Sequence, residues 1–424
     1  MTEIIVLSIF IVVYIFIVLE RHHKAVVAMI GGTTIMLLVF KDPLEALVKY
    51  VDFNTLFLLV GMMVLVAVVK RSGFFHFLGL YALKLSKGNI LVLYFILNVF
   101  VGILSSFLDN VTTILVAIPI SFAICDAADL DPTFFVISEI LSSNIGGTAT
   151  LIGDPPNIMI GSAAGLAFTD FVYHLAPAVF PTLLAVLGLL AVVYRKEIFR
   201  KLPEEIVRGF EPKKAIVDKR LFYISVSLIL VAVVLFSLQK TLNLESFEIA
   251  LLVGFFSLIF LKKEEVEEVL REVEWGTLFF FIGLFLVVGA LEETGIVDRI
   301  ATFLKTLSGT SLDRSLIAVL VFSGVLSAFI GSVPFTATMI PVVRRLVEVV
   351  PISSSGPHPL WWALSLGACL GANGSLIGGQ ANMVGISLLQ GRGKNISFIQ
   401  FLKVGFPIVI LSLLLSIPYL VLRY

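Results

Sequence analysis

A polar segment occurs twice in this chain and constrains its fold more than any other feature. The stretch Gly102–Pro119 returns as Gly324–Pro341, 222 positions further on, with its Gly, its first Ser and its Pro in matching places. Two further pairs keep nearly the same spacing, namely Asp52–Gly61 with Glu274–Gly283 and, at 225 positions, Leu151–Asn157 with Leu376–Asn382. Unrelated helix contacts made of small residues would not keep this register. The sequence therefore predicts two copies of one structural unit, an arrangement typical of transport proteins.

The composition predicts a polytopic membrane protein. Of the 424 residues, 58% are hydrophobic and 14% are charged, and the formal net charge is zero. There is no basic stripe with interleaved aromatic residues, so no nucleic-acid partner is expected. Cys125 and Cys369 lie in different halves without the spacing of a disulfide framework or a metal site. We expect the lipid bilayer to be the main surrounding of this chain.

Apolar runs long enough to cross a hydrocarbon layer of roughly 30 Å divide the chain. The uninterrupted ones are Ile4–Leu19, Ala25–Phe40, Thr55–Val69, Phe171–Tyr194, Leu221–Leu238, Ile249–Leu261, Thr277–Leu291 and Val404–Leu422. Others have a polar centre and predict re-entrant hairpins, Ile90–Ile124 with a break at Ser105–Thr113 and Leu316–Val349 with a break at Ser327–Thr338. The rest predict helices that unwind midway, Phe134–Leu166 at Asn144–Asn157 and Trp361–Leu389 at Asn373–Asn382.

Irregular backbone at membrane depth is tolerated only where protein or a wet cavity surrounds it, so these breaks should converge on one polar site. Each half crosses the membrane an odd number of times, which inverts the second copy relative to the first. The predicted fold is an all-α polytopic membrane protein with two inverted-topology repeats, about 10 transmembrane helices, two re-entrant hairpins and two discontinuous helices. The first repeat covers residues 1–194, a cytoplasmic linker covers 195–220 and the second repeat covers 221–424.

The distribution of basic residues predicts the orientation. When the linker is placed in the cytoplasm, most of the 30 Lys and Arg residues fall on its side. Both chain ends then lie outside, the first hairpin opens from the cytoplasm and the second from the outside. A count of twelve spans, with each hairpin arm as a crossing, would make the repeats parallel and scatter the charges. We therefore favour the inverted arrangement, in a prokaryotic cytoplasmic membrane.

The polar breaks supply the candidate ligands. A hairpin tip with hydroxyl, amide and carboxylate groups offers oxygen atoms to a cation and free N–H groups to an anion. Glycines permit the second type of break, and Pro155 and Pro156 can begin a new half-helix. The candidate ion-binding residues are Ser105, Asp109, Asn110, Thr112, Thr113, Asn144, Gly146, Gly147, Thr148, Asp154, Asn157, Ser332, Thr336, Asn373, Ser375, Gly378 and Asn382.

Three carboxylates, Asp109, Glu139 and Asp154, fall deep within apolar segments. A charge at that depth is expensive, and such groups commonly serve as proton relays or ion ligands. Structural roles are the alternatives: a half-helix cap for Asp154, a tether to backbone donors for Glu139 and a turn for Asp109. The second repeat has glycine at the positions that match Asp109 and Asp154. The titratable groups therefore belong to the first repeat.

Charge near the breaks favours coupling to a cation. No Lys or Arg lies within any of them, so a multiply charged anion would depend on helix dipoles, amides and bound cations. His174, near the outer end of a predicted span, is a second candidate proton relay beside Glu139, with simple solvation as the alternative.

At this point the motifs resemble a known family. Phe107–Thr113, Asn144–Asn157, Pro334–Pro341 and Gly371–Gly378 are similar to those of the melanosomal P-protein type of permease. That type belongs to the ion transporter superfamily, with ArsB-type arsenite pumps, NhaD-type sodium/proton antiporters and divalent anion/sodium symporters. The resemblance covers nearly the full chain. One departure is Gly331-Ser332, where such relatives usually have Asp-Asn, and it puts a second cation site in doubt.

The resemblance implies a scaffold domain, a transport domain, an elevator mechanism and a homodimer. It places the substrate and coupling ions between the hairpin tips and the broken helices. Residues carried over by it are Asp109, Asn110, Thr113, Asn144, Gly146, Thr148, Asp154 and Asn157 from the first repeat, and Thr336, Asn373, Ser375, Gly378 and Asn382 from the second. The expected partner is a small inorganic or organic ion, and no cofactor is expected apart from a coupling Na⁺ or H⁺.

We infer a secondary active ion transporter, driven by a proton or sodium gradient, with Asp109 and Asp154 as coupling ligands. A sodium-coupled citrate, dicarboxylate or oxyanion carrier is the alternative. An intramembrane aspartyl enzyme would also use two buried aspartates, but Leu151–Asp154 lacks the first glycine of the GxGD pattern. A passive channel is a further alternative, although paired inverted hairpins favour a moving carrier over a fixed pore.

Overall fold

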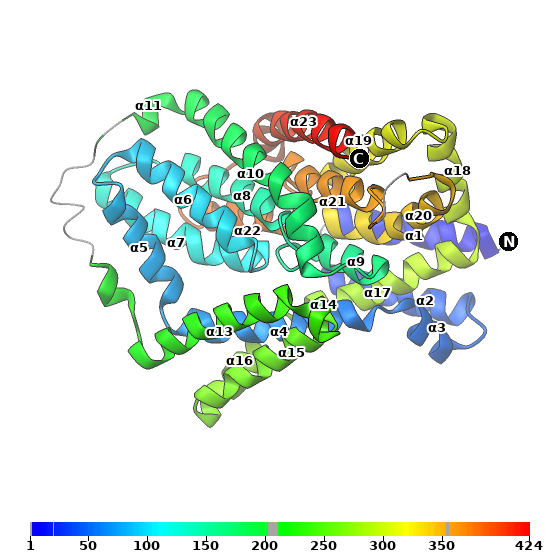
Figure 1. Ribbon diagram of the computed structural model, residues 1–424, viewed down its shortest axis with the longest axis horizontal. Helices are drawn as coiled ribbons and strands as arrows, with labels where there is room; N and C mark the ends of the chain where they lie inside the picture. Colours follow the sequence, from blue (N-terminus) through cyan, green and yellow to red (C-terminus); the bar gives the residue numbers. More distant parts are fainter. Residues whose placement is uncertain (1, 20, 200, 202–210, 353–355) are drawn as a thin grey trace.

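The computed structural model describes residues 2–19, 21–199, 201, 211–352 and 356–424. Its described residues form helices joined by short connections (Figure 1). The first half contains α1 (Thr2–Leu19), α2 (Lys24–Leu38), α3 (Pro43–Tyr50), α4 (Phe53–Arg71), α5 (Phe74–Leu85), α6 (Ile90–Ser105), α7 (Asn110–Ala128), α8 (Thr133–Gly147), α9 (Pro155–Ala164), α10 (Phe168–Val193) and α11 (Arg195–Ile198). The second contains η1 (Pro212–Ala215), α13 (Lys219–Ser237), α14 (Gln239–Leu242), α15 (Ser246–Ser257), η2 (Leu258–Phe260), α16 (Lys263–Glu272), α17 (Trp275–Glu293), α18 (Ile296–Ser308), α19 (Leu312–Ile330), α20 (Ser332–Val349), α21 (Leu360–Gly371), η3 (Ala372–Gly374), α22 (Gln380–Gln390) and α23 (Phe398–Arg423).

The chain is a multi-pass integral membrane protein. Within the described residues, eight helices are long and apolar enough to cross a membrane, and shorter apolar helices accompany them. Many large apolar side chains on their surfaces are exposed, as expected where lipid takes the place of a protein core. The all-α fold predicted from the sequence is confirmed.

The two repeats cross each other at matched glycines. Helix α2 packs along α17, and its repeat counterpart α15 packs along α4. A Cβ atom added to Gly283 would lie 2.3 Å from the backbone of Ala28, and one added to Gly61 would lie 2.3 Å from the backbone of Ala250. Gly61 and Gly283 occupy equivalent positions in the repeats, as do Ala28 and Ala250. The same close helix crossing is therefore built twice, with the roles of the repeats exchanged.

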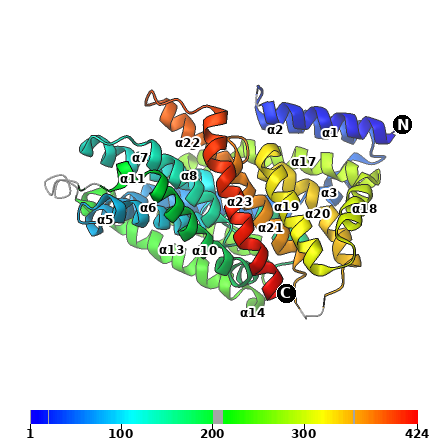
Figure 2. The same cartoon turned by 90° about the horizontal axis from the view of Figure 1, so that it is seen from above.

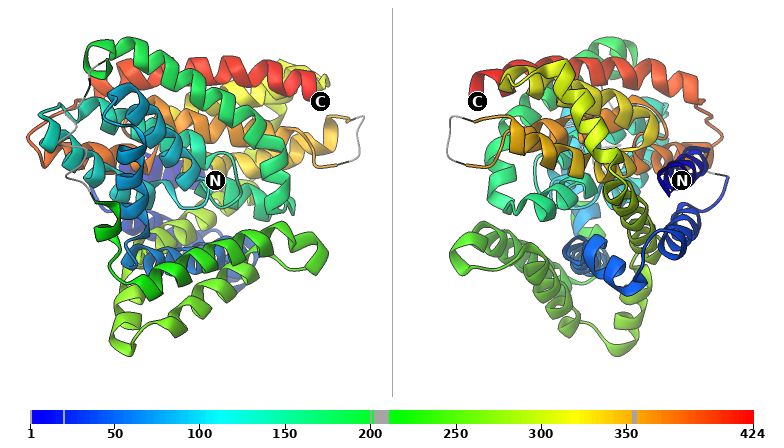
Figure 3. Two further views of the ribbon diagram at one scale, coloured as in Figure 1. Left: turned by 60° about the vertical axis from the view of Figure 1, so that its left-hand side comes forward. Right: turned by 90° about the vertical axis from the view of Figure 1, so that its right-hand side faces the viewer.

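The helices form two layers, which we call the scaffold layer and the transport layer. The scaffold layer contains α2, α4, α13, α15 and α17 and lies below the other helices in Figure 3. The transport layer contains the hairpins α6–α7 and α19–α20, the broken helices and the final helices of both repeats. Those final helices, α10 and α23, lie side by side (Figure 2). The polar breaks lie where the two layers meet.

The predicted hairpins and broken helices are present, with narrower breaks than expected. The first hairpin turns over residues 106–109, within the predicted Ser105–Thr113. The second turns at Gly331 alone, so the predicted break at Ser327–Thr338 was wrong in extent. Gly331 has a φ of +97°, which only glycine adopts readily, and this sharp turn lets the helices resume at once. The broken helices are interrupted at residues 148–154 and 372–379, where η3 forms part of the second interruption.

Short helices occupy positions that the apolar pattern did not predict. They are α3 and α16 before the matched α4 and α17, and α5 and α18 after them. Apolar and polar residues share these segments, which shortens their apolar runs below the length of a span. Their matched positions extend the repeat through both halves.

The ends of the molecule carry separate sets of ion pairs. In Figure 1 the N-terminus, α3 and α18 lie at one end of the long axis, and α5 and α11 lie at the other. We name these the outer and inner ends, after the predicted orientation. Among the described residues each ion pair joins groups of one end, as in Lys49–Glu293 at the outer end and Arg392–Asp126 at the inner end. The predicted linker 195–220 belongs to the inner end, and its residues 200 and 202–210 lie outside the described part.

Candidate functional site

A buried amide joins the two repeats at the centre of the transport layer. Nδ2 of Asn144, at the end of α8, donates to Oδ1 of Asn373 and to Oδ1 of Asn382, both at 2.8 Å. All three side chains are buried. Because both amide hydrogens of Asn144 are engaged, only its Oδ1 remains to meet a ligand.

Asparagines of α9 and α22 close the two broken helices. Nδ2 of Asn157 donates to the carbonyls of Thr148 at 3.0 Å and Thr150 at 2.8 Å. At the equivalent position, Nδ2 of Asn382 donates to the carbonyls of Ala372 and Ser375, both at 2.7 Å. Unwinding leaves these carbonyls without helical partners, and the amides satisfy them inside the protein. These predicted ligands therefore brace the breaks.

Hydroxyl groups tie each break to the hairpin of its own repeat. Thr150 Oγ1 donates to the carbonyl of Ser106, and its counterpart Ser375 Oγ donates to the carbonyl of Ala328 at 2.5 Å. Ser105 Oγ lies 3.0 Å from Ser143 Oγ in the first repeat. Each hairpin and its neighbouring break consequently form one rigid unit.

Close glycine contacts bring the same pieces together. A Cβ atom on Gly146 would lie 2.1 Å from the carbonyl oxygen of Gly102, and one on Gly371 would lie 2.5 Å from that of Gly324. A Cβ atom on Gly147 would lie 2.4 Å from Oδ1 of Asn110 as placed. Gly146 and Gly147 were predicted as ligands. As glycines they have no side-chain ligand atoms, and their role in the structure is to permit close contact with the hairpin.

A small cavity of about 30 Å³, which we call the chamber, lies between the hairpin tips, the breaks and the scaffold layer. Its volume suits one or two small ions or waters. Five predicted site residues line it, namely Asp109, Asn110, Asn144, Asp154 and Ser332. Its other lining residues are Leu59, Met63, Val111, Pro155, Glu274, Thr277, Val333, Ala372, Gly379, Gln380 and Ala381.

Helix N-termini converge on the chamber from four directions. Asn110, Pro155, Ser332 and Gln380 are the first residues of α7, α9, α20 and α22, and all four line it. The dipoles of these helix ends create a positive potential there, although α9 begins with Pro155 and Pro156, which have no N–H group to offer. An anion in the chamber would be stabilised without a Lys or Arg side chain.

Two carboxylates of the first repeat face this positive region in different ways. Oδ1 of Asp109 accepts the N–H of Thr112 at 2.9 Å, so this side chain caps α7 while it lines the chamber. Asp154 occupies the N-cap position of α9 without making a capping bond. It is 3% exposed, and its Oδ2 has no hydrogen-bond partner among the described residues. The half-helix cap, the predicted alternative for Asp154, does not describe that residue, whereas Asp109, with a turn as its predicted alternative, bonds locally at the start of α7.

The amide of Asn110 completes the surroundings of Asp154. In the orientation that satisfies its neighbours, Nδ2 of Asn110 lies 3.1 Å from the carbonyl oxygen of Ser143, 3.2 Å from that of Gly153 and 2.5 Å from Ser105 Oγ. The side chains of Asn110 and Cys369 both lie beside the carboxyl group of Asp154. A proton or a cation bound at Asp154 would compensate the burial of this carboxyl group.

Glu274 is a chamber residue that we did not select from the sequence. It precedes α17 and accepts a hydrogen bond from Thr277 Oγ1 at 2.9 Å. The signal that marks it was the repeat match between Asp52 and Glu274, which we used for register alone. Gln380 and Thr277 were also missed: Gln380 lies within the predicted break Asn373–Asn382, and Thr277 begins the predicted span Thr277–Leu291.

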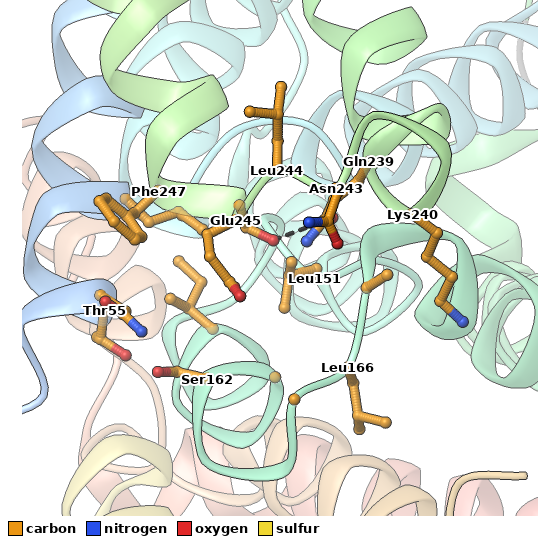
Figure 4. Close-up of a pocket in the computed structure, with 17 residues that line it drawn as sticks. Thr55, Leu151, Ser162, Leu166, Gln239, Lys240, Asn243, Leu244, Glu245 and Phe247 are labelled. Carbon is orange, nitrogen blue, oxygen red and sulfur yellow. Dashed lines mark hydrogen bonds between the residues drawn. The ribbon is translucent and has the colours of Figure 1, made fainter.

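The chamber communicates with the inner end. A cavity of about 400 Å³, the inner vestibule, is lined at its far side by His22, His23 and Lys24. It shares with the chamber the residues Val111, Glu274, Thr277, Ser332, Val333, Gly379 and Gln380. Cavities of about 300 and 450 Å³ open at the outer end, and neither shares a lining residue with the chamber. Figure 4 shows the first of these outer pockets.

The remaining predicted residues lie near the chamber or apart from it. Gly378 lines the inner vestibule, and its carbonyl accepts the N–H of Ser332 at 2.9 Å. The hydroxyls of Thr113 and Thr336 are buried without a partner among the described residues. Thr112 contributes its N–H to Asp109, and Thr148 Oγ1 donates to the carbonyl of Asn144 at 2.8 Å.

The two predicted proton relays do not line the chamber. Glu139 is buried on α8 and accepts a hydrogen bond from Ser121 Oγ of α7, so the alternative of a tether to backbone donors was wrong. The structure stacks the ring of His174 on that of Trp362, with ring centres 4.7 Å apart, and joins it to the hydroxyl of Tyr424. These contacts pack α10 against α21 and α23. Among the described residues, no group of three His, Cys, Asp or Glu side chains is placed to hold a metal ion.

Comparison with known proteins relates the chain to membrane transporters. The profile of the citrate transporter family matches residues 14–367. An uncharacterized transporter of Mycobacterium tuberculosis is 34% identical over 425 residues, which cover 100% of this chain and 99% of the relative. The P protein of Sus scrofa is 32% identical over 97% of this chain and 58% of its own length. The expected resemblance to P-protein permeases is confirmed.

Solved structures share the fold at low sequence identity. The YdaH transporter of Alcanivorax borkumensis has a TM-score of 0.59 and 14% identity, and the match covers 91% of this chain and 90% of that structure. MtrF of Neisseria gonorrhoeae, described as illuminating a class of antimetabolite efflux pumps, has a TM-score of 0.62 and 12% identity over 99% of this chain and 94% of its own.

Proposed function

Because this chain belongs to the citrate transporter family, we propose that its transport is driven by a proton or Na⁺ that binds at Asp154. The chain is a secondary transporter and not an enzyme. The observation that carries the proposal is the buried Oδ2 of Asp154, which has no partner among the described residues and belongs to a side chain that lines the chamber. A coupling cation would supply the missing partner of this oxygen atom.

The proposed substrate is a small anion, with citrate as the first member to test. Four helix N-termini meet at the chamber, and such a group stabilises negative charge through its helix dipoles. The chamber itself holds only one or two small ions, so a carboxylate of the size of citrate would extend into the inner vestibule. A cation on Asp109 or Asp154 would offset part of the charge of the substrate.

A second candidate is exchange of Na⁺ or arsenite against protons, as in the ArsB and NhaD types. The observation that favours it is the acidic lining of the chamber, where Asp109, Asp154 and Glu274 meet no Lys or Arg side chain among the lining residues. In symport of an anion the carboxylates would bind the coupling cation, whereas in antiport they would bind the transported cation or a proton. Transport assays separate the two mechanisms.

The test is transport by the purified protein in liposomes that contain a pH-sensitive dye. Citrate, arsenite and sodium are added in turn, with and without a sodium gradient. We expect a flux with one of them that is lost in Asp154→Asn and reduced in Asp109→Asn. Asp313→Asn is the matched control, because Asp313 is exposed on α19 far from the chamber lining. A flux that Asp154→Asn leaves intact would contradict coupling at this residue.

We also propose that the transport layer moves along the scaffold layer in an elevator mechanism, and that the protein is a homodimer in a bacterial membrane with both ends outside. Rigid contacts between each hairpin and its break support movement of that layer as a unit. Its mycobacterial relatives support a bacterial membrane. Labelling of cysteines introduced at the two ends of the chain by a membrane-impermeant reagent tests the orientation, and cross-linking in the membrane tests the dimer.

A further inference from the structure

Two carboxylates at equivalent positions of the repeats stand at opposite ends of the molecule. Asp52 precedes α4, and Glu274 precedes α17. Oδ2 of Asp52 accepts from Thr55 Oγ1 at 2.6 Å, and Oε2 of Glu274 accepts from Thr277 Oγ1 at 2.9 Å. Each carboxylate is thus fixed on its scaffold helix by the same local contact. The local structure is symmetric, so any difference between the two sites reflects their surroundings.

The two sites differ in their contact with the transport layer. Oδ1 of Asp52 accepts a hydrogen bond from Ser162 Oγ of α9 at 2.8 Å. Ser387 of α22 matches Ser162 at the spacing of the broken helices, yet its side chain is exposed. Glu274 accepts its hydrogen bond from Thr277 of its own helix, and the charge of Lys24 also acts on it. The hydrogen bond between Ser162 and Asp52 therefore joins the layers at the outer end, and the equivalent bond between Ser387 and Glu274 is not formed at the inner end.

The cavities follow the same asymmetry. Ser162 lines both outer pockets, and Figure 4 places it beside Thr55 on one wall. Neither outer pocket reaches the chamber. At the inner end Glu274 lines both the vestibule and the chamber, so the path is open where the hydrogen bond is missing. The contact with the scaffold carboxylate closes one end, and its absence opens the other.

We propose that Asp52–Ser162 and Glu274–Ser387 are two latches that close in turn during transport. In the structure the outer latch, Asp52–Ser162, is closed and the chamber opens to the inner end. In the opposite state Ser387 donates to Glu274, Ser162 leaves Asp52, and the chamber opens to the outer end. This inference rests on the proposed alternating movement. It makes Glu274 a positioning residue at the mouth of the chamber in one state and a latch in the other.

Cross-linking of paired cysteines tests the proposal in proteoliposomes. The two variants are Asp52→Cys with Ser162→Cys, and Glu274→Cys with Ser387→Cys. A short bifunctional thiol reagent spans each pair only when its latch is closed. The native Cys125 and Cys369 are buried, and the wild type and the four single variants control for their reaction. We expect both pairs to cross-link in a protein that exchanges between states, and a cross-link at either pair to prevent exchange.

Serine variants give a second readout that does not depend on cysteine chemistry at the latches. The labelling rate of Gln380→Cys reports access through the inner vestibule, which this residue lines. Loss of a hydrogen bond to a charged group shifts a two-state equilibrium by about tenfold or more. Ser387→Ala should therefore favour the inward-open state and speed labelling, whereas Ser162→Ala should slow it.

The outcomes separate the latches from the proposed function. The latch proposal is wrong if the inner pair never cross-links while the outer pair does in a protein that carries its substrate, or if the serine variants label at equal rates. If the wild type carries none of the tested ions but both pairs cross-link, the latches stand and the proposed substrate and coupling are wrong. If the wild type carries none of the tested ions and only the outer pair cross-links, the proposed alternating movement is wrong.

Discussion

The crossing of the repeats predicts how the protein responds to one added methyl group. In Gly61→Ala the new Cβ would lie 2.3 Å from the carbonyl carbon of Ala250, and in Gly283→Ala it would lie 2.3 Å from that of Ala28. The obstacle is backbone in both cases, so the helices must separate. Overpacking of this kind costs about 1–3 kcal/mol, and more where backbone has to move. Alanine also favours the helix over glycine by about 1 kcal/mol, which offsets part of the loss.

Gly188→Ala supplies the matched control. Gly188 lies inside α10, and an added Cβ would meet nothing within 4 Å. Its gain in helix propensity is the same, so the difference between Gly61→Ala and Gly188→Ala isolates the overpacking cost of about 1–3 kcal/mol. Unfolding in mixed micelles with increasing denaturing detergent measures the free energy of each variant. The pseudo-symmetry further predicts nearly equal losses for Gly61→Ala and Gly283→Ala.

The result that would refute this reasoning is a Gly61→Ala protein as stable as Gly188→Ala. Helices that tolerate the methyl group would not be in backbone contact, and the crossing could not hold the scaffold together. Clearly unequal losses for the two crossing glycines would contradict the equivalence of the repeats. Transport assays add a functional measure, because a loosened scaffold should also slow the proposed movement of the transport layer along it.

Three further predictions concern the site and an outer loop. Asn144→Asp puts a carboxylate oxygen opposite two amide oxygens now 2.8 Å from Nδ2, and the loss of two hydrogen bonds should cost about 2 kcal/mol or more and abolish transport in proteoliposomes. Gly331→Ala, at a φ of +97°, should cost about 1–3 kcal/mol of unfolding free energy in mixed micelles, because an L-residue is strained there. Burial lowers the pKa of His358 from its ordinary 6.5, although a backbone hydrogen bond opposes this shift. Its neutral ring is favoured in the fold, so the melting temperature should fall as the pH drops below 6.5, and His358→Asn should remove that dependence.

Much of this architecture follows from the sequence because repetition supplies an internal comparison. The match of Gly102–Pro119 with Gly324–Pro341 located both hairpins, and Pro155 marked the start of a half-helix. The single-residue turn at Gly331 did not follow, since a φ above zero leaves no mark on neighbouring residues. The different roles of the asparagines could not be predicted either. Asn157 and Asn382 have the composition of ligands, and only the fold shows that they brace carbonyls.

Glu274 illustrates a different limit of sequence reasoning. Its apolar surroundings begin only after it, so it reads as a helix cap at the membrane surface. Three-dimensional contact with the chamber depends on how deeply the vestibule penetrates, which is a property of the packing between layers. For Glu139, depth in the sequence pattern indicated a functional charge, and the structure places it away from the chamber with Ser121 as its partner, so its role as a proton relay stays a prediction.

The glycine that replaces a carboxylate in the second repeat shows how symmetry and chemistry are combined. Asp154 and Gly379 have nearly the same backbone, with φ and ψ of −144° and 132° against −138° and 146°. Glycine is therefore not needed for conformation at position 379. A Cβ there would lie 3.3 Å from the Cβ of Ala372 and 3.4 Å from both Nδ2 of Asn144 and Oδ1 of Asn382, so a side chain at this position would stand against the amide bridge between the repeats.

The symmetric frame therefore carries only one such carboxylate. The backbone of the repeats supplies two equivalent breaks, as the proposed alternating access requires, while only the first break has a carboxylate that can bind a cation. A coupling ion on Asp154 would therefore travel with α9 through the whole cycle, because the equivalent position on α22 offers no second carboxylate to receive it.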